Sequence, residues 1–151
     1  MNTIEKETVN IRRMGRRDID AVLAIDKKIS GGQGLITYKD MVAADPGGAL
    51  DLSFVAEVEG MVVGFILARL TYVSVPFIEL ATIQAVVVHP NYQRRGIATR
   101  LVNALLGLCH AEGVNAIRAV IDEHNADVRR FFQRLGFRRS ELVNYVRTFE
   151  S

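Results

Sequence analysis

The segment Gln93–Arg100, with the sequence QRRGIATR, holds the residues of this chain that are best suited to chemistry. It follows an apolar run and leads into an amphipathic helical pattern, so its second half forms the first turn of a helix. The backbone N–H groups of such a turn have no partner within the helix and lie at the positive end of its dipole. A helix start of this kind binds phosphate groups.

Small and basic side chains in the same segment support this interpretation. Gly96 lets a ligand approach the backbone because glycine has no Cβ atom, and Ala98 is small for the same reason. Arg94, Arg95 and Arg100 add positive charge that suits a pyrophosphate. The segment lacks both the G-K-[S/T] of a P-loop and the G-x-G-x-x-G of a dinucleotide fingerprint. We predict a phosphate-binding loop, with a solvated basic loop as the alternative.

Helical patterns come first along the chain, and strand patterns follow. Apolar residues recur at helical spacing after Asp18, the expected N-cap of a helix that reaches Ile29. A shorter helix is expected from about Thr37 to just before Asp45. Residues Glu59 and Gly60 are expected to form a hairpin turn. Three strands are predicted at Ser53–Val58, Met61–Val73 and Phe77–His89.

Helices and strands alternate in the second half of the chain. A long amphipathic helix follows Pro90, and Gly113 is placed to form its left-handed C-terminal cap. A strand is predicted at Ala116–Ile121, and one or two more at Phe137–Phe149. Between them lies a helix that Asn125 caps and Gly136 closes. This order favours an α/β fold in which helices pack on a mixed sheet.

Length and composition indicate an ordinary globular protein. The 151 residues suit one domain, 1–151, with a formal net charge of only +2 and one cysteine, Cys109. The charge is too small to indicate a nucleic-acid-binding protein. We also expect no metal site, because the three histidines and the cysteine are scattered. No signal peptide or membrane-spanning run is evident, so we predict a cytoplasmic protein without membrane contact.

Two blocks of the sequence resemble the GNAT superfamily of N-acetyltransferases. Gln93–Ala98 (QRRGIA) resembles the family motif Q/R-x-x-G-x-G/A, and it follows a strand that ends in Val-Val-Val-His-Pro. Asn125 with Phe131–Phe137 (FFQRLGF) resembles the family block N-x-x-A/V-x-x-F/Y-Y-x-x-x-G-F. A looser match is Phe54–Gly64, the family's hairpin between its second and third strands. The resemblance covers about residues 10 to 149 and implies a mixed, mostly antiparallel six- to seven-stranded sheet with helices on both faces.

The resemblance also implies acetyl-CoA as co-substrate. In the family the fourth strand carries a bulge and splays from the fifth, and the pantetheine arm pairs with backbone groups in that gap. The corresponding positions here are Val86 and Val88, and one of their N–H groups would polarise the thioester carbonyl. Asn125 would reach the pantetheine arm, unless it serves only as a helix cap, and Phe132 would touch the cofactor. The pyrophosphate would rest on the amides of Arg94, Arg95, Gly96, Ile97, Ala98 and Thr99.

Family members transfer acetyl groups by direct attack of a neutral amine, which needs a base and often uses a tyrosine as general acid. Glu79 is the leading candidate for the base, with a solvated strand-end charge as the alternative interpretation. Asp122 and Glu123 are weaker candidates. The family's frequent tyrosine in the last-helix block is Phe132 here, which cannot donate a proton. Tyr145 is the expected acid if a side chain fills that role.

The sequence does not identify the acceptor of the acetyl group. It is either a small-molecule amine or a protein N-terminus or lysine, and the Ser30–Gly34 and Tyr72–Phe77 loops would shape its site. Phe132 stands where the family often has tyrosine, and this replacement supports a second hypothesis. In that hypothesis the chain is a non-catalytic acyl-CoA-binding or regulatory module on the same fold. A third hypothesis, nucleic-acid binding through the arginine groups, is weaker because acidic residues nearly balance them. A homodimer is also predicted, through pairing of the expected last strand, Leu142–Phe149.

Overall fold

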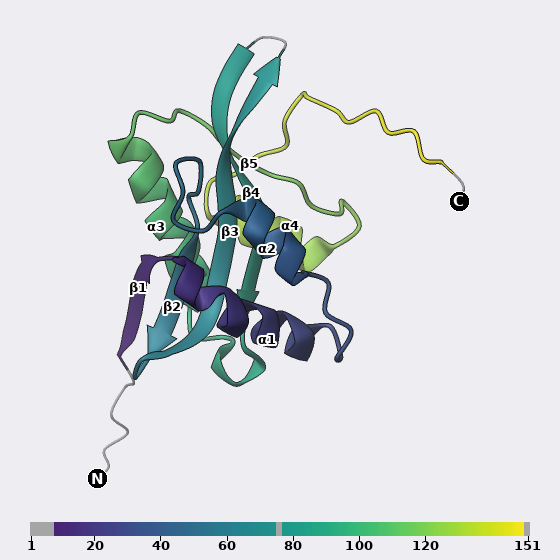
Figure 1. The fold of residues 1–151 in the computed structure, drawn as a ribbon. Helices are drawn as coiled ribbons and strands as arrows, with labels where there is room; N and C mark the ends of the chain where they lie inside the picture. Colours follow the sequence, from purple (N-terminus) through teal and green to yellow (C-terminus); the bar gives the residue numbers. More distant parts are fainter. Residues whose placement is uncertain (1–7, 75–76, 150–151) are drawn as a thin grey trace. The chain divides into compact units, whose positions relative to one another are not determined.

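The computed structural model describes residues 8–74 and 77–149. The chain divides into two compact units, Met1–Val120 and Ile121–Ser151, and each is described by itself. The first unit contains a five-stranded sheet in the order β1-β2-β3-β4-β5 (Figure 1). The first four strands are antiparallel neighbours, and β4 and β5 pair in parallel. The strands are β1 (Val9–Arg13), β2 (Phe54–Val58), β3 (Met61–Ser74), β4 (Phe77–Val88) and β5 (Ile117–Ala119).

The predicted mixed α/β sheet is confirmed, with five strands in the described residues and not six or seven. The prediction missed β1, a short and largely polar strand without a strong alternating pattern. It was wrong about the chain end, because the described residues of Phe137–Phe149 form neither strand nor helix. Weak alternation does not make a strand unless the backbone has a ladder to join. The homodimer prediction therefore loses the strand on which it depended.

The hairpin between β2 and β3 forms where the sequence predicts it. Glu59 and Gly60 both have positive φ, 51° and 80°. Two consecutive positive φ values match the right-handed twist of the flanking strands. Residues 75–76, within the expected Tyr72–Phe77 loop, lie outside the described residues. The rest of that segment is strand, since residues 72–74 belong to β3 and Phe77 begins β4.

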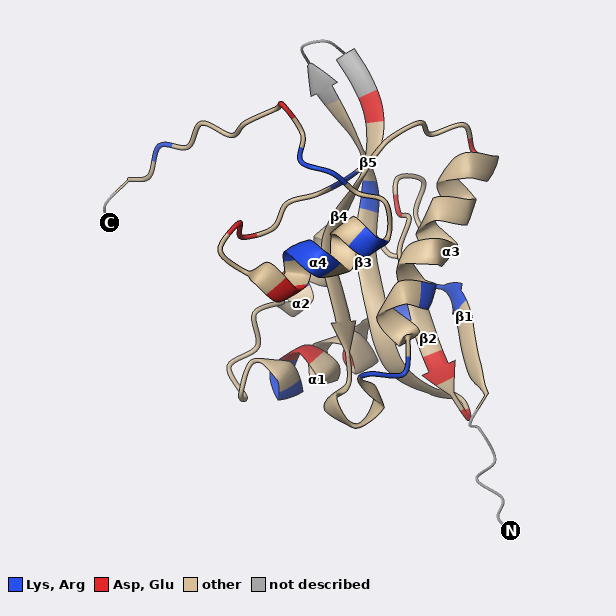
Figure 2. Ribbon diagram, turned by 180° about the vertical axis from the view of Figure 1, so that it is seen from behind, with Lys and Arg blue, Asp and Glu red and all other residues tan. Residues whose placement is uncertain are grey.

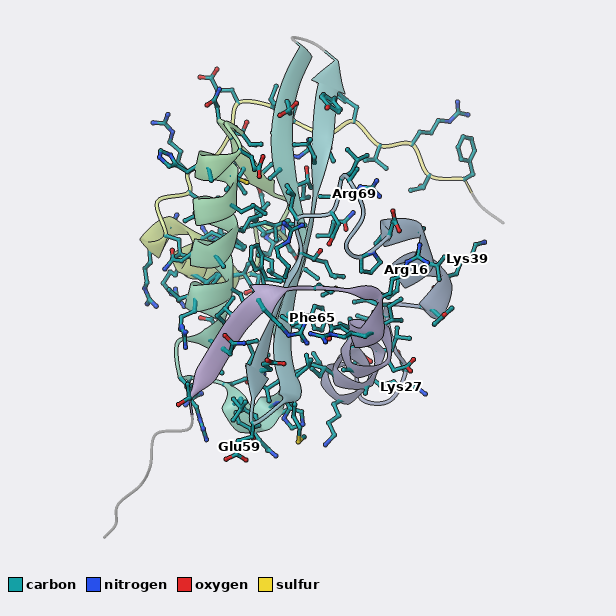
Figure 3. The ribbon with its side chains drawn as sticks, turned by 60° about the vertical axis from the view of Figure 1, so that its left-hand side comes forward. Arg16, Lys27, Lys39, Glu59, Phe65 and Arg69 are labelled. Carbon is teal, nitrogen blue, oxygen red and sulfur yellow. The ribbon has the colours of Figure 1, made fainter. Side chains whose placement is uncertain are left out.

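Helices cover both faces of this sheet. Figure 3 views it from the side, with α3 (Ile97–Ala111) on one side and α1 (Ile19–Ile29) and α2 (Tyr38–Ala44) on the other. On the α1 side, Phe65 and Leu67 of β3 form a buried cluster with Val22 and Ile25. On the α3 side, Gly64 of β3 lies against Ile97, as strand alternation requires. The apolar side chains of α1 and α3 are thus buried against opposite faces of one sheet.

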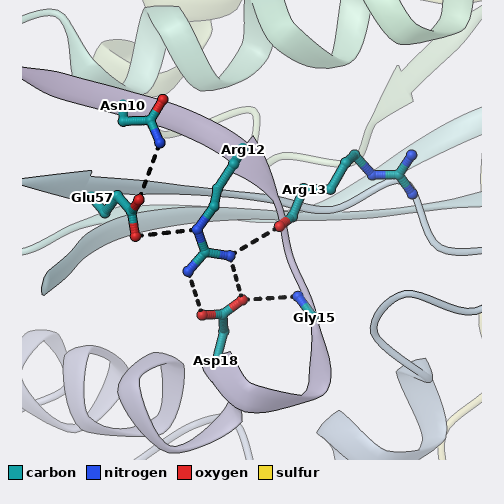
Figure 4. Close-up of polar contacts among 6 residues, drawn as sticks. All are labelled: Asn10, Arg12, Arg13, Gly15, Asp18 and Glu57. Carbon is teal, nitrogen blue, oxygen red and sulfur yellow. Dashed lines mark hydrogen bonds and ion pairs between the residues drawn. The ribbon is translucent and has the colours of Figure 1, made fainter. Parts of the chain in front are cut away.

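An ion-pair network ties β1 to the start of α1 (Figure 4). The Arg12 guanidinium donates to both Asp18 carboxylate oxygens at 2.8 and 2.9 Å and to Glu57 Oε2 at 3.1 Å. The Gly15 N–H donates to Asp18 Oδ2 at 2.8 Å. Asp18 precedes α1, after the short 3-10 helix Arg16–Asp18, but its side chain makes no cap hydrogen bond to α1. The N-cap prediction is therefore wrong in its chemistry, because Arg12 and Gly15 occupy the carboxylate.

The predicted start of α2 and the predicted glycine caps are confirmed. Thr37 Oγ1 accepts from the Asp40 N–H at 3.0 Å and begins α2. Gly113 has φ 74° just beyond α3, and Gly136 has φ 91° just beyond α4 (Ala126–Arg134).

No helix in the described part of the chain has the length and apolar character needed to cross a membrane.

The second unit is built around α4. Asn125 Oδ1 accepts from the Val128 N–H at 3.1 Å, so Asn125 is the N-cap of this helix. The Phe132 ring is 8% exposed and makes edge-on contacts with Phe131 and Phe137, with ring centres 5.1 Å apart in both pairs. Such T-shaped aromatic pairs are a favourable packing arrangement. Phe132 therefore packs between Phe131 and Phe137.

Candidate functional site

The register of β4 changes in the middle of the strand. Leu67 of β3 faces Ala85, but the next residue, Ala68, faces Ile83, so Gln84 is an extra residue in β4. This is a β-bulge, which bends a strand and interrupts its ladder. The resemblance implied such a bulge without giving its position, and the structure places it at Gln84.

Beside the bulge, β4 and β5 part. Among the described residues, β5 pairs with β4 only opposite Ala81, Thr82 and Ile83. The rest of β4, up to Val88, has β3 as its neighbour on one side and no pairing with β5 on the other. A strand edge of this kind presents backbone donors and acceptors that a bound chain can pair with.

Val86 and Val88 point their backbone groups toward that unpaired edge. The His89 N–H donates to the Val63 carbonyl of the neighbouring strand at 2.7 Å. In an antiparallel ladder, every second residue exchanges hydrogen bonds with a given neighbour. Val87 therefore shares the orientation of His89, and Val86 and Val88 face away from β3. These are the two positions that the resemblance assigned to the pantetheine arm.

The loop after β4 is fixed to the strand by Gln93. Its side-chain Nε2 donates to the Val88 carbonyl at 3.0 Å, so the first residue of the QRRGIA motif ties the loop to the splayed edge. His89 has a structural role: its Nδ1 accepts from the Asn91 N–H at 3.1 Å, and it is the N-cap of the short 3-10 helix Pro90–Tyr92.

Helix α3 begins at this loop with its first turn unsatisfied. Gly96 is the N-cap with φ 77° and provides no side chain to cap the turn. The first helical hydrogen bond runs from the Arg100 N–H to the Gly96 carbonyl, at 3.1 Å. The N–H groups of Ile97, Ala98 and Thr99 therefore have no acceptor within the helix. Their positions match the predicted phosphate cradle.

The backbone before Gly96 also takes an unusual conformation. Arg94 has φ 64°, a left-handed value that is uncommon for a residue with a side chain. Alternating left- and right-handed residues turn successive N–H groups toward one side and create a concavity that binds anions. Arg95 lies over the Tyr92 ring, with its guanidinium carbon 5.1 Å from the ring centre. Figure 2 shows the two arginines as a blue stretch of ribbon that leads into α3.

This arrangement fits a pyrophosphate attached to a linear arm. A Cβ atom built on Gly96 would meet nothing within 4 Å, so the loop leaves open space at that position for a ligand. Gln93 ties the end of the outward-facing edge of β4 to the loop that leads into the unsatisfied first turn of α3. One extended ligand can therefore pair with β4 and place a charged end on α3.

Among the described residues, no group of three or more His, Cys, Asp or Glu side chains is arranged to hold a metal ion.

Glu79 lies on β4 opposite Tyr72 of β3. The Tyr72 hydroxyl donates to Glu79 Oε2 at 3.3 Å, and both side chains are exposed. Glu79 precedes Val86 by seven residues, which corresponds to roughly 20 Å of extended strand. The structure therefore does not bring Glu79 into direct contact with the outward-facing amides of Val86 and Val88.

The remaining predicted site residues lie in the second unit. Tyr145 is 96% exposed in a segment without regular structure. Asn125 caps α4 through its carbonyl oxygen, which leaves the side-chain NH₂ for a ligand. Asp122 accepts from the His124 N–H at 2.9 Å, and Glu123 pairs with Arg139 at 3.4 Å. Both weaker base candidates thus have local structural partners.

Sequence reasoning missed two polar residues at the point where β4 and β5 part. Thr82 of β4 faces Arg118 of β5, and Arg118 Nη2 donates to Thr82 Oγ1 at 3.2 Å. The signal was present, because Arg118 interrupts an otherwise apolar strand, AIRAVI. A charge at such a position is uncommon unless a partner or a ligand meets it.

Comparison with known proteins agrees with this geometry. The profile of the Acetyltransferase (GNAT) family matches residues 26–137. An uncharacterized N-acetyltransferase of Methanocaldococcus jannaschii is 28% identical over 148 residues, which cover 91% of this chain and 64% of the relative. The chain thus spans just under two thirds of the length of that relative.

Solved structures show the same fold at low sequence identity. The aminoglycoside N-acetyltransferase AAC(6')-Iy in complex with CoA superposes with a TM-score of 0.74 at 20% identity, covering 97% of this chain and 99% of that one. The ribosomal-protein-S18-alanine N-acetyltransferase of Escherichia coli gives a TM-score of 0.75 at 20% identity, covering 88% of this chain and 79% of that one.

Proposed function

Because the chain belongs to the GNAT family of acetyltransferases, we propose that it is an N-acetyltransferase that acts on a primary amine. Acetyl-CoA is the co-substrate of this family. The observation that carries the proposal is the continuity between the outward-facing edge of β4 and the unsatisfied first turn of α3. The fold alone would not carry it, since many functions share a fold.

Each half of the site has a distinct proposed task. Val86 and Val88 pair with the pantetheine arm, and the Val86 N–H donates to the thioester carbonyl oxygen. The thioester supplies an activated acetyl group: its C–S bond breaks as the amine nitrogen forms the new C–N bond, and coenzyme A leaves as the thiolate. The pyrophosphate rests on the amides that begin α3, with Arg94 and Arg95 beside them. In the second unit, Asn125 and Phe132 are proposed contacts of the same cofactor.

Two protons must move in the reaction. The attacking amine loses one to a base, and the thiolate gains one from an acid or from water. We propose Glu79 as the base and Tyr145 as the acid. Given the length of strand between Glu79 and Val86, Glu79 acts through bound water and not by direct contact. Tyr145 needs to be covered by the bound substrates, because it is open to solvent in the free chain.

Direct transfer is favoured over an acetyl-cysteine intermediate. Cys109 is the only cysteine of the chain, and it is 2% exposed within α3. Burial raises the pKa of its thiol, which lowers the fraction of thiolate available to attack. The amine therefore attacks the thioester itself. Incubation with acetyl-CoA in the absence of an amine should leave the intact mass of the protein unchanged.

The acceptor class is left broad by the relatives. One acts on aminoglycosides and another on the alanine of a ribosomal protein, so both a small-molecule amine and a protein amine have precedents on this fold.

The exposed apolar residues near the chain end would be covered in the proposed homodimer; they are Leu142, Val143, Tyr145, Val146 and Phe149. Light scattering that gives the mass of a single chain at working concentration would contradict the homodimer.

A non-catalytic acyl-CoA-binding module is the second candidate. It is favoured by Phe132, which stands where many family members have a tyrosine, and by the exposure of Tyr145. This candidate shares the cofactor site with the first and differs only in turnover. An assay of turnover therefore separates the two.

The deciding assay follows release of the coenzyme A thiol from acetyl-CoA across a panel of amines. The enzyme hypothesis requires amine-dependent release, and the Glu79→Gln variant should then lose roughly 10²- to 10⁴-fold in kcat/KM with acetyl-CoA binding intact. Glu112→Gln, an exposed residue at the end of α3, is the control with the same chemical change. Acetyl-CoA binding without release on any amine would support the non-catalytic module. Equal rates for Glu79→Gln and Glu112→Gln would remove Glu79 as the base.

A further inference from the structure

Arg69, Thr82 and Arg118 form one row across β3, β4 and β5. Thr82 faces Arg69 on one side and Arg118 on the other. Residues that face each other across a sheet direct their side chains to the same face. Figure 3 shows Arg69 on the side of the sheet that carries α1 and α2. The row lies one residue before Ile83, the last residue of β4 to pair with β5, so it borders the point where the two strands part.

A chain of hydrogen bonds fixes the Arg118 guanidinium in this row. Thr71 Oγ1 donates to the Leu80 carbonyl at 3.2 Å and lies 2.7 Å from Thr82 Oγ1. A hydroxyl has one proton, so Thr82 donates to Thr71 and uses a lone pair to accept from Arg118 Nη2 at 3.2 Å. The bonds run in one direction, from Arg118 through two threonines to the backbone. The guanidinium is thereby oriented before any ligand arrives.

Arg118 is nevertheless incompletely satisfied. Its Nε atom is buried and has no hydrogen-bond partner. Burying a charged donor without a partner is costly, and such atoms are rare in native proteins. Nor does a carboxylate balance the charge, since within residues 8–74 and 77–149 no Asp or Glu forms an ion pair with Arg118 or Arg69.

Asp51, which lies opposite Arg69 across a backbone bridge, has other partners for its carboxylate. Its carboxylate oxygens accept from the Gly47 and Ser53 N–H groups at 3.0 and 3.2 Å. The two guanidinium-bearing residues start from strands on either side of β4, roughly 10 Å apart. The Arg69 side chain is long enough to reach an anion that the oriented Arg118 guanidinium binds.

We propose that Arg118, with Arg69, binds an anionic group of the acceptor, so that the substrate is a primary amine that also carries a carboxylate or a phosphate. This inference rests on the proposed acetyltransferase function. An oxyanion supplies the missing acceptor for Arg118 Nε and balances both positive charges. The amine of a small zwitterionic substrate then lies beside the gap between β4 and β5. Polycationic amines such as aminoglycosides are disfavoured, because two guanidinium groups repel them.

The test compares amines that differ only in charge. Thiol release from acetyl-CoA is measured with glycine and glutamate as carboxylates, O-phosphoethanolamine as a phosphate, ethanolamine as a neutral acceptor and spermidine as a polycation. We expect the carboxylate or phosphate amines to be preferred over ethanolamine. Arg118→Gln should raise KM for the preferred acceptor roughly 10- to 100-fold, because a charge-assisted contact is lost. Arg118→Lys should restore part of the loss, and Arg16→Gln, an exposed arginine far along the chain, should change nothing.

Binding measurements keep the inference separate from the proposed function. Acetyl-CoA should raise the unfolding temperature of wild type and Arg118→Gln equally, which also shows that the variant folds. The N-acetylated form of the preferred acceptor, N-acetylglycine among the probes, should raise it for wild type only. Preference for ethanolamine or spermidine, or an unchanged KM in Arg118→Gln, would overturn the anionic acceptor and leave the acetyltransferase standing. Failure of acetyl-CoA to bind, with N-acetylglycine still recognised through Arg118, would overturn the acetyltransferase and keep the anion site.

Discussion

Asp18 shows at the scale of one residue how the sheet and the first helix are joined. Its side chain is 4% exposed and receives hydrogen bonds from Arg12 and from the Gly15 N–H. Burial alone would raise the pKa of this carboxyl, but the bonds from Arg12 and Gly15 outweigh it and lower the pKa below its ordinary value of 3.8. The hydrogen bond that Arg12 donates to Asp18, together with the one it donates to Glu57, outweighs burial and raises the pKa of the Arg12 guanidinium. The pair is therefore charged throughout the neutral range.

Asp18→Asn should destabilise the protein by about 3 kcal/mol, because the partly buried Arg12 would lose its bidentate carboxylate partner and keep only Glu57. Denaturant unfolding at pH 7 measures this loss. The pH dependence has a definite sign, since a carboxyl with a lowered folded-state pKa contributes stability above about pH 4. That contribution is lost as the pH falls through the folded-state pKa, so wild type and variant should converge in acid. Asp20→Asn, an exposed residue of α1, is the control and should cost at most about 1 kcal/mol.

At the scale of elements, β3, β4 and α3 are held together by a close approach at Gly64. A Cβ atom at this position would lie 3.1 Å from the Val87 carbonyl oxygen and 3.5 Å from the Ile97 side chain. The first of these atoms belongs to the backbone and cannot rotate away. Gly64 therefore sets the position of the β4 segment whose outer edge is proposed to bind the pantetheine arm.

Gly64→Ala should lower the free energy of unfolding by about 1 to 3 kcal/mol, the usual cost of overpacking, and should also weaken acetyl-CoA binding. Gly107→Ala is the matched control, since Gly107 lies inside α3 and a Cβ there meets nothing within 4 Å. We expect that control to gain up to about 1 kcal/mol from the helix propensity of alanine. Denaturant titration with and without acetyl-CoA measures both effects. Equal stability of the two variants would contradict the close approach.

Local sequence patterns predicted most of these elements. Phe54–Val58 and Met61–Ser74 formed where alternation and the Glu59-Gly60 turn indicated them, and α3 began at Gly96 as expected. The extra residue Gln84 could not be read from the sequence, because a bulge is defined by the register of two strands and not by one strand's composition.

The largest difference lies in the last part of the chain. The Phe137–Phe149 segment has the apolar residues of a strand but forms none in the described residues, since strand formation depends on a partner that local pattern does not specify. For the site, the motif predicted a glycine-led helix start after β4, which the structure shows, and phosphate binding there stays a prediction. It gave no sign of the Thr71–Thr82–Arg118 chain, because those residues are distant in sequence and meet only across the sheet.

For the whole molecule, the central claim is that the turn at Gly96 and the edge of β4 together bind acetyl-CoA. Thermal unfolding with acetyl-CoA, with ATP and NAD as comparison ligands, tests it most directly. A ligand at ~100 times its dissociation constant adds about 2.7 kcal/mol, a shift of several degrees in a domain of this size. Gly96→Ala and Gly60→Ala make a matched pair, because both glycines have positive φ, 77° and 80°, and open space around a new Cβ.

Both variants should lose similar stability, and only Gly60→Ala should keep the full shift with acetyl-CoA. That result, with little or no shift from ATP or NAD, would support the cofactor site. A folded wild type that does not respond to acetyl-CoA, or a Gly96→Ala variant that responds as fully as Gly60→Ala, would contradict it.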